Sequence, residues 1–255
     1  MKLKQKFQTA CEILRSERLH ALARHTAAKL WHSVHKTGGD GATGWEVRKK
    51  TVDATFDSDH GVDTGGTTYL NDLNIAGPHR RFGVCHIASD PDEFADAVAS
   101  LNIEHQDFTL IDLGSGKGRA LILGLSYPFR RILGVEFALE LHHAAETNLI
   151  SLAATGTDTC RIKLLHADVT KFDFPLEPLV VFLYNPFEGV VMRKVVERVR
   201  QTHAENPRPI FILYVNPVLE KVWLEGGFFP LKRGGAFSLL APKSPGFGKA
   251  AVSNC

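Results

Sequence analysis

The sequence predicts an α/β protein built on a mostly parallel sheet that ends in an antiparallel hairpin and follows an N-terminal helical extension. Five short apolar runs alternate with helical stretches from residue 108 onward, and such alternation gives a parallel sheet covered by helices. Two later strand-like runs, Phe228–Lys232 and Ala236–Ala241, are separated only by a short glycine turn, which predicts the hairpin. Three alternate glycines follow the first apolar run, and they predict a tight turn into a helix.

The first elements lie in a basic N-terminal region. Residues 3–35 place apolar residues at helical spacing among Lys, Arg and His, and "KTGGDGATG" (36–44) then breaks the pattern. A polar stretch reaches residue 60, and residues 56–75 are expected to form a loop and a short element. Residues 1–50 hold 11 Lys or Arg against 4 acidic residues, although the whole chain carries only +2. Such an arm suits nucleic acid, an anionic membrane or an acidic protein, and it equally suits a solvated helix face.

The later elements follow one another regularly. Residues 89–103 predict a capped helix, with Ser89 or Asp90 as N-cap and Pro91 at its first position. The expected strands are 108–113, 131–136, 161–166, 179–184 and 209–215, and the expected helices are 117–127, 138–153, 189–203 and 217–225. We therefore expect a basic helical region and linker (1–55), one domain (56–243) and a flexible tail (244–255).

Composition narrows the class of protein. Hydrophobic residues make up 44% of the 255 residues and charged residues 23%, as in ordinary soluble domains. The four cysteines form no CxxC pair, which argues against a disulfide scaffold or zinc ribbon and favours the cytoplasm. No run of about 18 apolar residues suggests a membrane span, and the first residues lack the apolar core of a secretory signal. His142 and His143 have no third ligand at metal spacing, so no metal is expected.

The segment "LIDLGSGKGRALI" (110–122) carries the most specific motif. A P-loop is excluded because Gly118, not Ser or Thr, follows Lys117, and Arg119 stands where a dinucleotide fingerprint has its third glycine. Asp112 followed by Leu-Gly-Ser-Gly-Lys-Gly completes an acidic residue plus xGxGxG. This run resembles the fingerprint of class I S-adenosylmethionine-dependent methyltransferases, and a purely structural glycine turn is the alternative.

The resemblance implies a Rossmann-like class I methyltransferase fold and a cofactor site. Glu136 ends the second strand, 18 residues after Gly118, where an acid binds ribose hydroxyls. Asp168 follows the third strand in "LLHADVTKFDF" (164–174), where the family's acid contacts the adenine amino group. A solvated strand end or a helix cap is the plainer interpretation of each acid. The implied S-adenosyl-L-methionine site consists of Asp112, Gly114, Ser115, Gly116, Gly118, Glu136 and Asp168.

A second resemblance concerns the methyl acceptor. The fourth strand ends in "VVFLYNPFEG" (180–189), which resembles the [DNS]PP[YFW] motif of amino-group methyltransferases with one proline instead of two. It resembles more distantly the Asn-Phe segment of the non-SET histone-lysine methyltransferase family. The resemblance implies that Asn185, Pro186 and Phe187 form the acceptor site, where oxygen atoms accept hydrogen bonds from a substrate nitrogen. A simple strand-ending turn is the alternative.

An upstream segment, "GVDTGG" (61–66), is similar to one in uncharacterised bacterial methyltransferase-like proteins that carry the same "DLGSGKGR" run. That resemblance implies that Asp63 and Thr64, with Gly65, meet the methionine end of the cofactor. A plain Asp-Thr turn is the alternative.

The predicted function is methyl transfer from S-adenosyl-L-methionine to a protein amine such as lysine. Two alternatives stay open: a methyltransferase for nucleic acid, reached through the basic arm, or for a small molecule, and a non-catalytic binding module. The cofactor carries the reactivity, so no enzyme nucleophile is required. His60, His86 and His166 are expected near the site, but none stands out as a general base.

Overall fold

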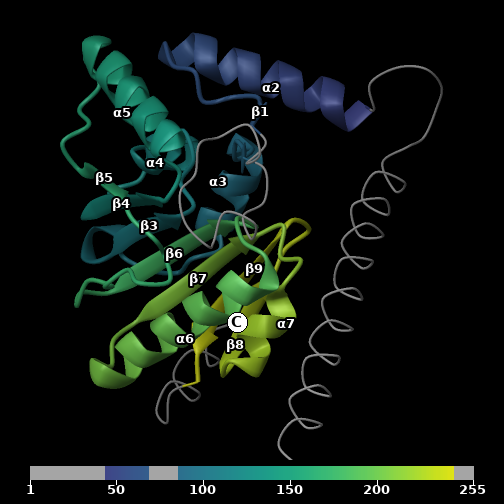
Figure 1. Ribbon diagram of the computed structural model, residues 1–255, viewed down its shortest axis with the longest axis vertical. Coiled ribbons are helices and arrows are strands. Elements are labelled where there is room, and N and C mark those ends of the chain that lie inside the picture. The colour runs from purple at the N-terminus through teal and green to yellow at the C-terminus, as the bar shows by residue number, and fades with distance from the viewer. Residues whose placement is uncertain (1–43, 69–85, 244–255) are drawn as a thin grey trace, which may run out of the picture. The chain divides into compact units, whose positions relative to one another are not determined.

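The computed structural model describes residues 44–68 and 86–243 (Figure 1). The chain divides into two units, Met1–Thr51 and Val52–Cys255, and the boundary expected between residues 55 and 56 falls inside helix α2 (Gly44–His60). The helix expected over 3–35 and the tail expected over 244–255 lie outside the described residues. Among the helices that are described, none is long and apolar enough to cross a membrane.

The second unit is organised around a seven-stranded sheet in the order β5-β4-β3-β6-β7-β9-β8. Strands β5, β4, β3, β6 and β7 are parallel, β9 runs antiparallel to β7, and β8 antiparallel to β9. This is the Rossmann-like α/β fold that the sequence predicts, including its closing hairpin. The strands are β3 (Thr109–Leu113), β4 (Arg131–Glu136), β5 (Ile162–His166), β6 (Leu179–Tyr184), β7 (Ile210–Val215), β8 (Phe228–Arg233) and β9 (Phe237–Pro242).

Helices cover both faces of the sheet because successive strand residues point to opposite sides. In β6, Val181 and Leu183 belong to one apolar cluster with side chains of α6 and α7, whereas Val180 and Phe182 belong to another with side chains of α3 and α4. Figure 1 shows α6 and α7 together on one side of the sheet. The helices are α3 (Pro91–Ala99), α4 (Arg119–Gly124), α5 (Leu139–Ala154), α6 (Gly189–Glu205) and α7 (Glu220–Glu225).

Local sequence explains the α3 terminus but not α2. Asp90 caps α3 by accepting from the Asp92 and Glu93 backbone N–H groups, with proline at the first position, as predicted. The loop expected from residue 56 is wrong at its start, because α2 includes the polar stretch and continues to His60. The helix lacks a continuous apolar stripe, and long-range contacts of a few of its side chains stabilise it instead.

Two arginines hold the connections at the amino ends of the strands. Arg208 is 8% exposed and donates to the backbone carbonyls of Pro175, Glu177, Thr202 and Asn206. Arg161 donates to the carbonyls of Leu125, Tyr127 and Phe129. Both guanidinium groups thus tie together several backbone carbonyls of the connecting segments. The residues singled out for chemistry lie at the opposite, carboxyl ends of the strands.

Candidate cofactor and acceptor site

The glycine turn connects β3 to α4, as predicted. Gly114, Gly116 and Gly118 all have positive φ angles, of 83°, 53° and 91°, which L side chains rarely adopt. The first two also allow close approach. A Cβ atom on Gly114 would lie 2.6 Å from Pro186 Cβ, and one on Gly116 would overlap the His86 ring. The turn therefore requires glycine for conformation and for space.

A pocket opens at the carboxyl ends of β3, β4 and β6. It brings together most of the residues predicted for a ligand site: Asp112, Gly114, Ser115, Gly116, Glu136, Pro186 and Phe187. The rest of the lining is His86, Ile87, Ala88, Ser89, Arg119, Ala120, Phe137, Leu141 and Tyr184. The glycine turn and the Asn-Pro-Phe turn, about 70 residues apart in sequence, thus form one site, as expected for an open α/β sheet.

Two buried carboxyl groups, Asp112 and Glu136, line this pocket. Asp112 is 4% exposed and Glu136 is 5% exposed. Burial and the neighbouring Glu136 raise the pKa of Asp112 to about 8. Burial also raises the pKa of Glu136, although its carboxylate accepts from the backbone N–H groups of Gly116 (2.9 Å) and Ala138 (2.8 Å). A ligand that brings positive charge relieves this cost of burial.

Ser115 adds a hydrogen-bonding group to the same wall. Its Oγ atom is buried and has no hydrogen-bond partner among the described residues. Buried hydroxyl groups are rarely left unpaired. The hydroxyl lies against Gly134 of β4, so the pocket itself offers a ligand the Glu136 carboxylate and a backbone free of side chains at Gly114 and Gly116.

The acceptor side carries two asparagines in strained backbone conformations. Asn185 follows β6 with φ 45°, and Asn216 follows β7 with φ 49°; no other non-glycine residue in the described ranges has a positive φ. Tyr184 and Val215 are paired in register, so the asparagines end adjacent strands side by side. Each precedes a proline, which normally favours an extended backbone. Such strain concentrates at functional sites.

A tyrosine links the two asparagine turns. The Tyr214 hydroxyl donates to Asn185 Oδ1 (2.9 Å) and accepts from the Leu219 backbone N–H (3.2 Å). Burial raises the pKa of Tyr214, so the hydroxyl stays protonated and orients the Asn185 amide. Sequence reasoning missed Asn216 and Tyr214. The repeated Asn-Pro after two apolar strands is the signal that was available.

Tyr184 is a second pocket residue that the sequence did not single out. Its hydroxyl donates to Glu93 Oε2 (2.9 Å). Burial and the Glu93 charge raise the pKa of Tyr184, so it remains a hydrogen-bond donor. Glu93 thereby brings a third carboxylate close to the pocket wall.

Several predicted site residues lie outside the pocket lining. Asp63 exposes its carboxylate and pairs with Lys117 (3.2 Å), whereas Thr64 is fully buried. Asp168 accepts from the N–H and hydroxyl of Thr170, both at 2.8 Å. Gly118 and Asn185 are also absent from the lining.

Of the three histidines expected near the site, only His86 lines the pocket. The His60 ring stacks on Phe56 and has Nδ1 2.9 Å from the Phe56 carbonyl. His166 Nε2 lies 3.0 Å from the Phe137 carbonyl, and its ring lies beside His142 at a centroid distance of 5.5 Å. Within the described part of the chain, no three His, Cys, Asp or Glu side chains are arranged to hold a metal ion.

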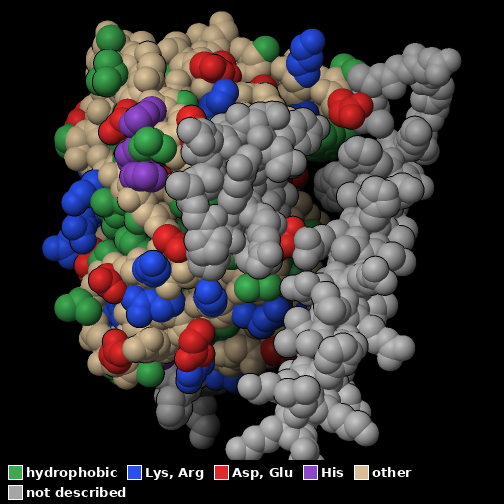
Figure 2. All heavy atoms as spheres, in the orientation of Figure 1, with side chains coloured by type: hydrophobic (Ala, Val, Ile, Leu, Met, Phe, Trp, Pro, Cys, Tyr) green, Lys and Arg blue, Asp and Glu red, His purple; other side chains and the backbone are tan. Residues whose placement is uncertain are grey.

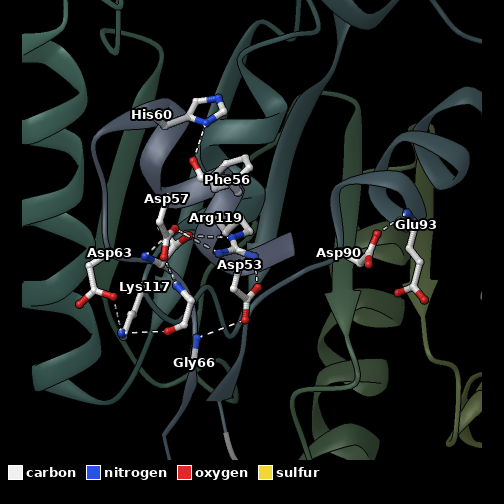
Figure 3. A network of polar contacts seen from close by, with 12 residues as sticks. Asp53, Phe56, Asp57, His60, Asp63, Gly66, Asp90, Glu93, Lys117 and Arg119 are labelled. Carbon is white, nitrogen blue, oxygen red and sulfur yellow. Dashed lines mark hydrogen bonds and ion pairs between the residues drawn. The ribbon is translucent and has the colours of Figure 1, made fainter. Parts of the chain in front are cut away.

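Arg119 has a role that its sequence position does not suggest. It occupies the place of the third glycine in a dinucleotide motif, yet its side chain is buried against α2, where it pairs with Asp53 and Asp57 (Figure 3). The arginine is thus committed to contacts within the protein.

Comparisons with known proteins give matches only among solved structures. No protein-family model matches the sequence, and no curated protein matches it. A precorrin-6y C5,15-methyltransferase from Geobacter metallireducens is similar over 68% of this chain and 95% of its own, with 16% identity and a TM-score of 0.46. A methyltransferase from Thiobacillus denitrificans, in complex with S-adenosylhomocysteine, is similar over 56% of this chain and 65% of its own, with 17% identity and a TM-score of 0.41.

A ribosomal protein L11 methylase from Lactobacillus delbrueckii subsp. bulgaricus is similar over 67% of this chain and 81% of its own, with 15% identity and a TM-score of 0.43. By their names, the precorrin-6y methyltransferase and the ribosomal protein L11 methylase act on different substrates.

Proposed function

We propose that this protein is an S-adenosylmethionine-dependent methyltransferase that methylates the nitrogen of an amine. The observation that carries the proposal is that one pocket joins two buried carboxyl groups, a glycine turn, and Pro186 and Phe187 of the Asn-Pro-Phe turn. When bound, the cofactor supplies an electrophilic methyl group on a cationic sulfur. The protein's part is to orient the ligand and to exclude water.

An acid at the end of the second strand also binds ribose in dinucleotide-binding folds, so the pyrophosphate is the group that separates the two cofactors. The pyrophosphate of a dinucleotide would bring negative charge toward Asp112 and Glu136. It also requires donors from a helix N-terminus, whereas α4 has only six residues and Arg119 is already paired with two carboxylates. The sulfonium and α-ammonium groups of S-adenosylmethionine are positive and suit the same wall.

The residues present fit the cofactor. Glu136 is the proposed partner of the ribose hydroxyls, and the bare backbone at Gly114 and Gly116 allows the cofactor to approach closely. Asp168 is the proposed adenine contact, because β5 lies next to β4 and both end at this edge. Pro186 and Phe187, which belong to the acceptor turn, line the pocket directly.

The acceptor turn favours an amine as substrate. Asn185 Oδ1 is held in place by the Tyr214 hydroxyl, and the backbone carbonyls of the turn are further possible acceptors. An amine that donates its hydrogens to such oxygens directs its lone pair away from them, toward the methyl donor. The carboxylate of Glu93 beside Tyr184 favours a basic molecule, which supports a protein amine such as lysine.

The face shown in Figure 2 gives no separate support to nucleic acid as the acceptor. On the described part of the face shown in Figure 2, acidic and basic side chains are interspersed. A phosphate-binding surface needs clustered positive charge.

Titration of the wild-type protein with S-adenosylhomocysteine and with NAD⁺ tests the cofactor. We expect binding of the first at micromolar concentrations and none of the second. Glu136→Gln should weaken binding about tenfold or more, because hydrogen bonds to a charged group are lost. Glu177→Gln is the matched control, since Glu177 bonds Thr109 and Arg131 at the amino ends of the strands. Binding of NAD⁺, or equal affinity in Glu136→Gln and wild type, would contradict the proposal.

The acceptor turn can be tested before a substrate is known. Sinefungin carries an amine where S-adenosylmethionine carries its transferable methyl group. Asn185→Ala should weaken sinefungin binding more than S-adenosylhomocysteine binding, since only the amine reaches the acceptor oxygens. Transfer of a labelled methyl group to a lysine peptide, a transfer RNA or a DNA duplex then separates the substrate classes. Transfer to nucleic acid alone would overturn the amine assignment.

A further inference from the structure

We infer that Arg119 and the carboxylates of Asp53 and Asp57 form a latch that holds residues 61–66 and the hairpin β1–β2 against the glycine turn. β1 spans Thr67–Thr68 and β2 spans His86–Ile87. The latch residues act as positioning residues for the cofactor pocket. The inference rests on the proposed function for the identity of the ligand, but not for the existence of the latch.

The latch centres on a buried guanidinium group. The Arg119 side chain is 1% exposed; it pairs with Asp53, with Asp57 at 3.1 Å, and donates from Nε to Thr64 Oγ1 at 2.7 Å. The guanidinium also lies 4.6 Å from the Phe56 ring centroid, a favourable cation–π contact. Removing one member of such a buried ion pair leaves the other charge unpaired, which is strongly destabilising.

The same two carboxylates hold the backbone of the 61–66 turn. Asp57 accepts from the N–H groups of Thr64 (3.0 Å) and Gly65 (2.8 Å) and from the Thr64 hydroxyl (2.6 Å). Asp53 Oδ2 accepts from the Gly66 N–H at 3.2 Å. Burial alone would raise the pKa of Asp57, but these hydrogen bonds and Arg119 together lower it, so the carboxylate stays charged. Figure 3 shows Asp53, Asp57 and Arg119 converging on this turn.

Two further side chains fasten the turn to the start of α4 and to α5. Lys117 Nζ lies 3.2 Å from Asp63 Oδ1 and 3.1 Å from the Gly65 carbonyl. Asn148, on α5, accepts from the Asp63 N–H (2.8 Å) and donates to the carbonyls of Asp63 (2.9 Å) and Lys117 (3.0 Å). Asp63 and Thr64, expected as cofactor contacts, are here used within the protein.

The latch reaches the pocket through His86. The turn leads directly into β1, which pairs antiparallel with β2. His86 Nε2 lies 3.5 Å from the Thr64 carbonyl, and its ring abuts Gly116. Residues 86–89 form one wall of the pocket. The position of that wall therefore depends on Arg119, which itself lines the pocket, and on the Asp53 and Asp57 carboxylates, which lie outside the lining.

Arg119→Met tests the latch, with Arg208→Met as the matched control. Both arginines are buried, but Arg208 bonds carbonyls at the amino ends of the strands, away from the pocket. Hydrogen–deuterium exchange of the ligand-free full chain should be about tenfold faster over residues 61–68 and 86–89 in Arg119→Met, and unchanged there in Arg208→Met. Affinity for S-adenosylhomocysteine should fall about tenfold in Arg119→Met and less than twofold in Arg208→Met, both measured well below the melting temperature.

The outcomes are distinct. Unchanged local exchange in Arg119→Met, or equal loss of affinity in both variants, overturns the latch. Faster exchange with unchanged affinity overturns its role in shaping the pocket. If wild type binds no S-adenosylhomocysteine, the proposed function fails, and the exchange data alone decide the latch. Should Arg119→Met fail to fold, Asp57→Asn provides the same comparison, and Arg119→Lys should restore part of the protection by keeping the charge.

Discussion

Gly116→Ala should destabilise the protein through a steric clash with His86. The added Cβ atom would lie 2.5 Å from His86 Cε1, inside the 3.0 Å that real Cβ atoms respect. The φ angle of 53° at residue 116 adds backbone strain once the residue is alanine. The His86 ring fills the space next to Gly116, so either the ring or strand β2 must move.

The magnitude has two parts. A left-handed backbone costs a non-glycine residue about 1–2 kcal/mol, and overpacking of a filled site adds about 1–3 kcal/mol. Gly156→Ala measures the first part alone, because Gly156 has φ 90° and a Cβ there would meet nothing within 4 Å. We therefore expect Gly116→Ala to lower the free energy of unfolding by about 2–5 kcal/mol and Gly156→Ala by about 1–2 kcal/mol.

Urea unfolding of both variants, and of the double variant His86→Ala/Gly116→Ala, provides the assay. Removing the imidazole should recover most of the steric part, so the double variant should be less destabilised by Gly116→Ala than wild type is. Equal costs for Gly116→Ala and Gly156→Ala, or no coupling with His86, would refute the reasoning.

Three further predictions concern the pocket and its acceptor turn. Between the unfolded pKa near 3.8 and the folded value of about 8 for Asp112, the unfolded chain binds fewer protons. Stability of the ligand-free protein should thus fall as pH rises from 5 to 8, by up to about 1.4 kcal/mol per pH unit, and urea unfolding of Asp112→Asn should show a flatter profile. Tyr214→Phe should cost about 1 kcal/mol in thermal unfolding and remove the selective effect of Asn185 on sinefungin affinity, which unchanged affinity would contradict. Asn216→Gly should raise the free energy of unfolding by about 0.5–1 kcal/mol by relieving strain, and a loss of stability would argue that the Asn216 side chain has a structural partner.

The sequence predicts the sheet well because its strands are buried on both faces. β4 and β6 coincide with the expected runs at 131–136 and 179–184, and the order of glycine, acid and asparagine turns follows from the parallel topology. The strand positions depend on residues that are close in sequence, and the order of the turns depends only on the parallel connection of successive strands.

Other features depend on contacts distant in sequence. Helix α2 was missed because its stabilising pairs involve Arg119, 66 residues after Asp53. The same contact explains why Thr64 is buried in a hydrogen-bond network outside the pocket lining. Asn216 was missed since an isolated Asn-Pro is an ordinary turn, and only the register of β6 with β7 places it beside Asn185.

The arginines at the amino ends of the strands have a consequence for how this protein can change. Arg161 and Arg208 bond backbone carbonyls near the amino ends of the strands, and none of those carbonyls belongs to a residue proposed for chemistry. The turns after β6 and β7 are therefore free to vary in sequence without loss of these anchors. Such separation makes a scaffold evolvable, because the residues at the carboxyl edge of the sheet can be exchanged while the opposite edge preserves folding.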